Sequence, residues 1–411
     1  MIRAAALACV LALPAGAGEF TTLKGHGGPV MALDVHPDGR VVTGSFDNAV
    51  GVWDGRTPEW RDGHEAAVTV VAVLPDGRIA SGGDDFAVRV WGGGDVVGRH
   101  EGKVTALAAM PDGTLVSGSW DGTVRVWRED GPVVHAMGGG VNAVAAMGDA
   151  LLVGTTEGTL LRLDPDGATV PLVRHGFGIN RIVVGEGWIA YGAVDGVTRV
   201  IDPEGEALAD FTLDRRPILS MAHHPGTARL AVGDGDGYVM VLDTALWDVA
   251  NDFRAARQGP VWALAYAPDG ATLYAGGLDD AAYAWPVDDL DAYEGAIDGD
   301  RTFLADPATM SNGERQFARK CSICHELTPG PSRRAGPTLH GLFGRIAGTV
   351  EGYSYSGTLD GSAIVWDAET IDALFDQGPD HYIPGSKMPM QLIAGADDRA
   401  DLIDYLREAT Q

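Results

Sequence analysis

The residues best suited to chemistry are in the stretch KCSICHE, at positions 320 to 326, where two cysteines and a histidine lie within five positions. The spacing Cys-x-x-Cys-His is the attachment signature of c-type haem, in which two thiols bond to the haem and the histidine binds its iron. A redox Cys-x-x-Cys would be expected within a βαβ pattern, which is absent here. A zinc site needs two more nitrogen or sulfur ligands, and the one further cysteine is Cys9. Cys321, Cys324 and His325 therefore predict one covalent haem c.

The segments around this motif agree with it. NGERQFARKCSICH, GPTLHGLFGRIAG, YSYSGTLDGSAIVWDAETIDALF, YIPGSKMPM and DLIDYLREAT follow in this order. Together they resemble a class I cytochrome c over about residues 307 to 411. The resemblance implies a small all-α domain in which a helix carrying Gly313 and Phe317 packs against a last helix carrying Leu402 and Tyr405.

The resemblance also implies a role for individual residues. Cys321 and Cys324 match the thioether cysteines, and His325 matches the proximal iron ligand. Met388 of PGSKM matches the distal ligand, with Met390 as its competitor. The remaining matches are to a carbonyl that orients the histidine ring (Pro337) and to groups that hold a buried haem propionate (Arg345, Tyr355 and Trp366). His340 and His381 are interpreted as surface residues.

His/Met ligation leaves the iron with six ligands and no open position. A thioether ligand favours Fe(II) and raises the reduction potential. Such a haem passes single electrons and does not bind a substrate, so the sequence predicts an electron carrier without catalytic residues in this domain.

The first two thirds of the chain repeat with a unit of roughly 36 to 43 residues. The three clearest copies begin at GHGGPVMALDVHPDG, GHEAAVTVVAVLPDG and RHEGKVTALAAMPDG, and four weaker copies follow. Each copy holds alternating apolar runs separated by turn residues, as strands do. These repeats resemble a WD40 β-propeller over about residues 24 to 288. The fold class expected for the whole chain is therefore multidomain: an all-β seven-bladed WD40-type propeller followed by a small all-α class I cytochrome c domain.

One acidic position fixes the register of the copies. It lies six residues before the last residue of each unit, and its members are Asp47, Asp85, Asp121, Glu157, Asp195, Asp236 and Asp279. In the first three copies a histidine, His26, His64 or His100, stands 21 residues ahead of the aspartate. The resemblance implies that this histidine, the aspartate and the closing tryptophan form a buried hydrogen-bonded set. EFTTL, residues 19 to 23, is predicted to close the ring as the outer strand of blade seven.

The start of the sequence reads as a secretory signal peptide, with one arginine, a ten-residue apolar run from Ala4 to Leu13, and small residues to Ala17. The expected division is a signal peptide at 1–18, the propeller at 19–288, an acidic linker at 289–306 and the cytochrome c domain at 307–411. We expect a periplasmic, bacterial location and no membrane span.

The net charge of the chain limits the kinds of partner that it can bind. The chain holds 30 Lys and Arg against 57 Asp and Glu, a net charge of −27, which argues against nucleic acid because phosphate binding needs a basic surface. Residues 301–411 contribute only −5 of it. Cations gather near the haem segments and predict a basic rim that docks onto the acidic propeller or an acidic partner: Arg315, Arg319, Lys320, Arg333, Arg334 and Lys387.

Three functions remain open from the sequence. The first is an exported electron-transfer protein whose propeller is a docking platform for redox protein partners of unknown identity. The second is a periplasmic oxidoreductase whose propeller holds a second cofactor or substrate site and whose haem is the electron outlet. The third is a haem sensor with a labile methionine ligand. The propeller histidines outside the predicted hydrogen-bonded sets are scattered, which disfavours a copper centre: His36, His135, His175, His223 and His224.

Overall fold

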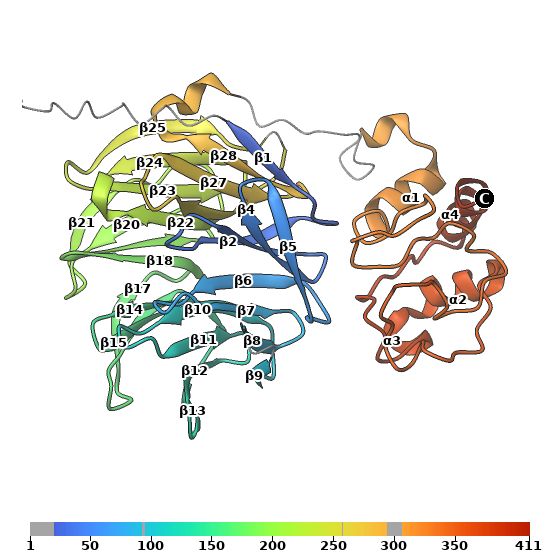
Figure 1. Ribbon diagram of the computed structural model, residues 1–411, viewed down its shortest axis with the longest axis horizontal. Coiled ribbons are helices and arrows are strands. Elements are labelled where there is room, and N and C mark those ends of the chain that lie inside the picture. The colour runs from blue at the N-terminus through green and yellow to red at the C-terminus, as the bar shows by residue number, and fades with distance from the viewer. Residues whose placement is uncertain (1–19, 93–94, 257, 294–305) are drawn as a thin grey trace, which may run out of the picture.

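The computed structural model describes residues 20–92, 95–256, 258–293 and 306–411. Its first part is a ring of seven four-stranded antiparallel sheets (Figure 1). The seven-bladed propeller expected from the repeats is confirmed. The predicted signal peptide and most of the predicted linker lie outside the described residues.

The blades follow one another along the chain. Blade 1 is β2 (Val30–Val35), β3 (Val41–Ser45), β4 (Ala49–Asp54) and β5 (Thr57–Asp62), and blade 2 is β6 (Val68–Val73), β7 (Ile79–Gly83), β8 (Ala87–Trp91) and β9 (Asp95–Arg99). Blade 3 is β10 (Val104–Ala109), β11 (Leu115–Ser119), β12 (Thr123–Arg128) and β13 (Gly131–Ala136). Blade 4 is β14 (Val141–Met147), β15 (Ala150–Thr155), β16 (Thr159–Leu163) and β17 (Thr169–Arg174).

Blade 5 is β18 (Ile179–Gly185), β19 (Trp188–Ala193), β20 (Thr198–Ile201) and β21 (Ala207–Asp210). Blade 6 is β22 (Ile218–His224), β23 (Arg229–Asp234), β24 (Tyr238–Asp243) and β25 (Asp248–Arg254), with the short helix η1 (Pro225–Thr227) after β22. Blade 7 is β26 (Val261–Tyr266), β27 (Thr272–Gly277) and β28 (Ala281–Pro286), completed by β1 (Thr21–Lys24).

The ring is closed by the two ends of the propeller segment. β1 pairs antiparallel with β28, with Thr21 opposite Ala284 and Lys24 opposite Ala281. This pairing confirms the predicted closing strand and covers an edge that would otherwise leave backbone groups unpaired. The next segment, η2 (Val287–Ala292), packs on the propeller through Leu290, which is 4% exposed. The packed part of the propeller thus reaches beyond the predicted boundary at 288.

The strands form where the sequence alternates, and their turns form where glycine permits it. In the three PDG turns, Gly39, Gly77 and Gly113 have φ of 90°, 84° and 86°, a left-handed conformation that costs glycine little. The strands that follow these turns are buried over their whole length in blades 1 to 3. Core clusters made from strands of neighbouring blades then join each sheet to the next.

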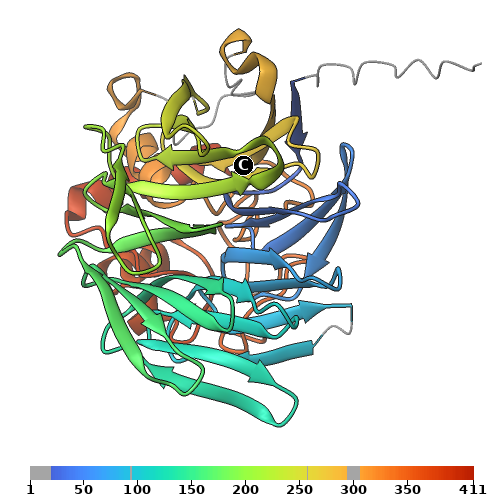
Figure 2. The ribbon, with the colours of Figure 1, turned by 90° about the vertical axis from the view of Figure 1, so that its left-hand side faces the viewer.

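The second part is a small helical domain beside one face of the ring (Figures 1 and 2). Its elements are η4 (Pro307–Thr309), α1 (Asn312–Lys320), α2 (Ala368–Gln377), α3 (Pro379–Tyr382) and α4 (Ala396–Ala409). The side chain of Ser311 caps α1, and Asp367 with Thr370 forms a capping box at α2, which satisfies amides that lack partners within each helix.

The predicted packing of the first helix on the last is present. A Cβ added at Gly313 would lie 2.0 Å from the carbonyl oxygen of Asp401, so the two helices cross at a distance that only glycine allows. The rings of Phe317 and Tyr405 lie 5.6 Å apart, and Leu402 is fully buried in the same core as Phe317.

Candidate functional site: the haem attachment turn and its surroundings

The cysteines and the histidine come together in one turn that follows α1. The amide of Cys321 donates to the carbonyl of Phe317, and the amides of Cys324 and His325 donate to the carbonyl of Cys321 at 3.0 and 2.9 Å. These hydrogen bonds place Cys321, Cys324 and His325 within one turn of the backbone. Cys321 is 4% exposed and belongs to the core of the helical domain. The motif is thus built into the domain and not displayed on a free loop.

His325 is oriented by a carbonyl, as expected. Its Nδ1 lies 2.8 Å from the carbonyl oxygen of Pro337. A carbonyl can only accept, so Nδ1 carries the proton and Nε2 keeps its lone pair for a metal. Burial lowers the pKa of His325, which favours the same neutral form.

Gly336 makes room for the His325 ring. A Cβ at position 336 would lie 2.3 Å from Cε1 of His325, which is closer than any carbon contact allows. The amide of Gly336 also donates to the carbonyl of Cys324 at 2.8 Å. The segment Gly336–Pro337 therefore fixes both the backbone of the attachment turn and the direction of the imidazole.

The two thiols are protonated at neutral pH in this arrangement. Burial raises the pKa of Cys321 to about 12 and that of Cys324 to about 11. Both cysteines are free, so they are not consumed by a disulfide. Two free thiols beside an oriented imidazole are the donor set that a covalent haem needs.

The structure places Met388 and Met390 differently. Met388 packs against the core of the helical domain, which includes Cys321 and Leu342. Met390 is 45% exposed and its sulfur lies close to Gly378. This difference favours Met388 as the inward-facing thioether.

The other predicted pocket residues lie on the loop between the attachment turn and α2. Arg345 donates to the carbonyls of His340 and Thr338 at 2.7 and 2.9 Å. The Tyr355 hydroxyl accepts from the amide of Val350 at 3.3 Å. The structure thus places Arg345 and Tyr355 in one loop region that also contacts the domain core through Trp366.

Ser356, which follows Tyr355, is a candidate for contact with a bound molecule that the sequence did not indicate. Among the described residues its Oγ is buried and has no hydrogen-bond partner. A buried hydroxyl normally has a partner, so this one is suited to a polar group of a bound molecule. The free thiols and the oriented imidazole together fit a covalent haem.

The predicted hydrogen-bonded sets of the propeller are confirmed in blades 1 to 3. In blade 1, Trp53 Nε1 donates to Thr43 Oγ1 at 2.9 Å, and this hydroxyl lies 2.6 Å from His26 Nε2. His26 Nδ1 lies 2.9 Å from Asp47 Oδ2. The carboxylate accepts, so a continuous relay runs from Trp53 through Thr43 and His26 to Asp47.

Blades 2 and 3 repeat this relay with serine in place of Thr43. Their histidines lie 3.0 and 2.8 Å from the aspartates. The two further relays are Trp91, Ser81, His64, Asp85 and Trp127, Ser117, His100, Asp121. These residues stabilise blades and are not available for catalysis.

Blades 5 and 6 have other pairs of side chains in place of the hydrogen-bonded set of blades 1 to 3. In blade 5, His175 Nε2 lies 3.0 Å from Asp195, so His175 belongs to a blade pair although the sequence reasoning counted it as scattered. Its separation of 20 residues from the aspartate, in place of 21, was the signal. In blade 6, Arg215 pairs with Asp234 at 3.1 Å, two positions before the predicted Asp236.

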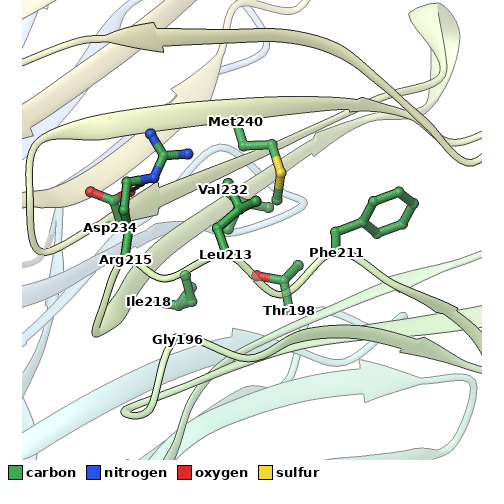
Figure 3. A pocket seen from close by; sticks show the side chains of 9 residues that line it. All are labelled: Gly196, Thr198, Phe211, Leu213, Arg215, Ile218, Val232, Asp234 and Met240. Carbon is green, nitrogen blue, oxygen red and sulfur yellow. Dashed lines mark ion pairs between the residues drawn. The ribbon is translucent and has the colours of Figure 1, made fainter.

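A small hollow lies between blades 5 and 6, beside this ion pair (Figure 3). Its volume is about 10 Å³, which is near the space that one water occupies. Among the described residues, Thr198 Oγ1 on its wall is buried and has no hydrogen-bond partner. The size and this hydroxyl suit a structural water and not a substrate.

The described part of the chain holds no group of three or more His, Cys, Asp or Glu side chains that could bind a metal ion. It also holds no helix that is long and apolar enough to cross a membrane.

The fold and the site define a c-type cytochrome domain joined to a WD-repeat propeller. The chain belongs to the cytochrome c family through its last hundred residues, where the cytochrome c family model matches 310–410. The model described as "WD domain, G-beta repeat" matches 19–54, 58–92, 95–128 and 250–285. These segments cover the first three strands of blades 1, 2, 3 and 7, whose units close on tryptophan, together with the outer strand of the preceding blade.

Individual relatives agree with the family. The cytochrome c of Sesamum indicum is 44% identical over 107 residues, which are 26% of this chain and 95% of the relative. That of Nigella damascena is 44% identical over 101 residues, 24% of this chain and 89% of the relative. That of Chlamydomonas reinhardtii is 39% identical over 110 residues, 26% of this chain and 97% of the relative. One covalently bound haem c is therefore the cofactor of this domain.

Proposed function

We propose that this chain is an exported single-electron carrier whose haem iron is bound by His325 and Met388 and whose propeller docks a redox protein partner. The observation that carries the proposal is the His325 side chain, whose Nδ1 is held by the Pro337 carbonyl at 2.8 Å and whose Nε2 is thereby prepared for iron. The packed position of Met388 supports the second ligand.

The chain's own residues divide the remaining work. Cys321 and Cys324 hold the haem covalently through thioether bonds. Arg345, Tyr355 and Trp366, on the loop that precedes α2, hold a propionate. When bound, the haem supplies reversible one-electron chemistry at iron. His325 and Met388 would together bind the iron, and the packed core beside them would keep substrate and water from it, as single-electron exchange requires.

The ligand assignment is tested by comparing Met388→Ala with Met390→Ala in the full-length protein. A thioether sulfur on ferric haem gives a weak far-red absorption band. We expect Met388→Ala to abolish this band and lower the reduction potential, and Met390→Ala to keep both. Loss of the band in Met390→Ala alone would assign the ligand to the other methionine.

The role of the propeller is tested by a count of cofactors per chain. One haem iron, with neither a second metal nor a quinone, is the result expected for a docking platform. A second redox cofactor at one per chain would make the propeller part of an oxidoreductase and would overturn this half of the proposal.

Export is tested by fractionation of cells that express the full-length gene. We expect the haem-containing protein in the periplasmic fraction, with its mature N-terminus near Gly18. Recovery of the haem protein in the cytoplasm, with residues 1–18 intact, would contradict export.

A further inference from the structure

Blade 1 differs from blades 2 and 3 at the surface that meets the helical domain. The residue after the relay histidine is Gly27 in blade 1, but Glu65 in blade 2 and Glu101 in blade 3. All three amides make the same bond, to the blade aspartate, at 2.7, 3.0 and 3.0 Å. Because this hydrogen bond forms with either residue, the fold of blade 1 does not require glycine at position 27.

Gly27 is in contact with the cytochrome domain. A Cβ at this position would lie 2.1 Å from the carbonyl carbon of Arg333 and 2.4 Å from the amide nitrogen of Arg334. Gly27 is not among the described glycines with a left-handed φ, so its own backbone would accept a side chain. The missing side chain is explained by the close approach of the two domains.

The outer strand of blade 1 supplies the second part of the contact. The Arg333 guanidinium lies 4.2 Å from the centre of the Trp60 ring and 2.7 Å from Asp62 Oδ1. A guanidinium over an indole face and beside a carboxylate is held by cation–π and ionic attraction together. Both partners are on β5, which runs along the side of the ring nearest the helical domain in Figure 1.

The position of Trp60 is fixed by the core of blade 1. Its ring lies 4.7 Å from that of His26 and 5.5 Å from that of Trp53. Gly51 makes room for it, because a Cβ there would lie 3.0 Å from the Trp60 ring. The residues at the position of Gly51 are Arg89 in blade 2 and Arg125 in blade 3. The rings of His26 and Trp53 and the space at Gly51 therefore hold the Trp60 ring in place on blade 1.

On the other side, Arg333 is tied to the haem attachment turn. The next residue, Arg334, donates to the carbonyl of Ser322, between the two haem cysteines, and lies 3.0 Å from Glu326. Ser322 is 3% exposed. The loop that contacts blade 1 is thus the loop that supports the attachment turn.

We propose that Gly27, Trp60 and Asp62 form a docking site for Arg333, which holds the cytochrome domain on blade 1 with its attachment loop covered. The contact is reversible and weakens as salt rises, because an exposed ion pair is screened by salt. Covalent linkage of the two domains raises their effective concentration, so a small contact suffices. A redox partner that approaches this loop must displace the propeller.

Glycine substitutions test the site without changing charge. In the full-length haem protein, Gly27→Ala places a Cβ against the Arg333 backbone, whereas at Gly28 the nearest atoms, at 3.3 and 3.4 Å, belong to Phe46 and Asp47 of blade 1. We expect Gly27→Ala to increase the radius of gyration in small-angle X-ray scattering. Amide hydrogen exchange in the peptide 329–336 should rise about tenfold, the change that loss of one such contact gives. Gly28→Ala should match the wild type in both measurements.

Charge reversals test the same site independently of blade stability. Arg333→Glu and Asp62→Arg should each increase exchange in the peptides 57–62 and 329–336, and the double variant should restore protection. Exposed residues provide matched controls, Arg319→Glu in the cytochrome domain and Asp54→Arg in blade 1. If Gly27→Ala and Arg333→Glu both keep the wild-type radius and exchange, the docking site is wrong. These readouts do not involve iron ligation, so they are independent of the proposed electron-carrier function.

Discussion

Blades 1 to 3 and blades 4 to 7 have the same strand order but are stabilised inside by different means. The first three each contain a relay of four side chains that ends at an aspartate and begins at a tryptophan. Blade 6 replaces the relay with an ion pair, and blade 7 retains Trp285 without the histidine. The sheet architecture therefore does not require the relay. Blade 1, which has the full relay, also makes the contact with Arg333 of the cytochrome domain.

The largest expected effect is the loss of unfolding free energy when a relay aspartate is removed, compared with removal of the equivalent aspartate in blade 6. Asp47 is 8% exposed and receives bonds from His26, Gly27 and Ala49. Removal of one partner of a buried polar pair is costly, so Asp47→Ala should lower the free energy of unfolding of the propeller by about 3 kcal/mol. Asp236 holds the same register position but is exposed. Asp236→Ala should change it by less than about 0.5 kcal/mol. Denaturant unfolding of the two variants measures the difference, and equal losses would contradict the comparison.

The next effect concerns the ion pair of blade 6. Asp234 is 4% exposed and lies 3.1 Å from Arg215, while Arg215 also contacts Asp252 at 2.7 Å. Asp234→Ala leaves the arginine with its more exposed partner alone, and should lower the free energy of unfolding by about 2 kcal/mol. Asp252→Ala is the control, because its carboxylate is 39% exposed, and it should cost well under half as much. A larger loss of unfolding free energy in Asp252→Ala than in Asp234→Ala would show that the Arg215–Asp234 ion pair does not take the place of the relay in blade 6.

Acid should destabilise blade 3 in two steps. Burial lowers the pKa of His100 below 6.5, so the unfolded chain takes up this proton first and stability begins to fall below pH 6.5. Burial alone would raise the pKa of Asp121, but bonds from Thr123, the Glu101 amide and His100 lower it to about 2. Its contribution is therefore complete above pH 3.8 and is lost as the pH falls towards 2.

The measurement is the midpoint of urea unfolding at a series of pH values. Asp121→Asn should be less stable than the wild type at neutral pH and should show a smaller decline between pH 4 and 2. A decline of unchanged size in this variant would assign the acid sensitivity to other carboxylates.

The smallest effect is a gain in blade 7. Among the described residues, Trp285 Nε1 is buried without a hydrogen-bond partner, and Ala275 holds the position of Thr43 in blade 1. Ala275→Ser supplies the missing acceptor, and should raise the free energy of unfolding by about 1 kcal/mol. Ala80→Ser adds the same hydroxyl in blade 2, where Trp91 already donates to Ser81, and should be neutral or destabilising. A rise in melting temperature only for Ala275→Ser would support the comparison.

The repeat pattern predicted the blades, and the resemblance to WD40 propellers added the histidine, aspartate and tryptophan of the relays in blades 1 to 3, because these residues keep a fixed spacing within one copy. The closing strand was predicted from the unpaired edge that the ring would otherwise have. The linking hydroxyls of Thr43, Ser81 and Ser117 were not predicted. The repeat pattern failed for Arg215 and Asp234, because an ion pair uses a longer side chain and so shifts the acidic position by two residues. It also missed His175, whose spacing is one residue short. Residue spacing within a copy predicts the hydrogen bonds of a blade only where that copy has the same types of side chain at the same positions.

In the cytochrome domain the motif predicted the attachment turn and the hydrogen bond from His325 to Pro337. Ser356 could not be found from spacing, because its distinguishing property is a buried hydroxyl that lacks a partner among the described residues. The basic rim was predicted as a group, and within the described residues the Arg333 side chain is the one that pairs with Asp62 and Trp60 of the propeller. Which cation meets which surface depends on tertiary geometry that local sequence does not encode.

The pairing of β1 with β28 has a consequence for the order in which the chain is made. Thr21 must find Ala284, so the ring stays open until nearly three quarters of the chain has been synthesised, and contacts this distant in sequence form late. The first haem cysteine, Cys321, lies 35 residues beyond the end of β28. Synthesis from the N-terminus therefore supplies β28, together with Trp60 and Asp62, before the residues of the attachment turn.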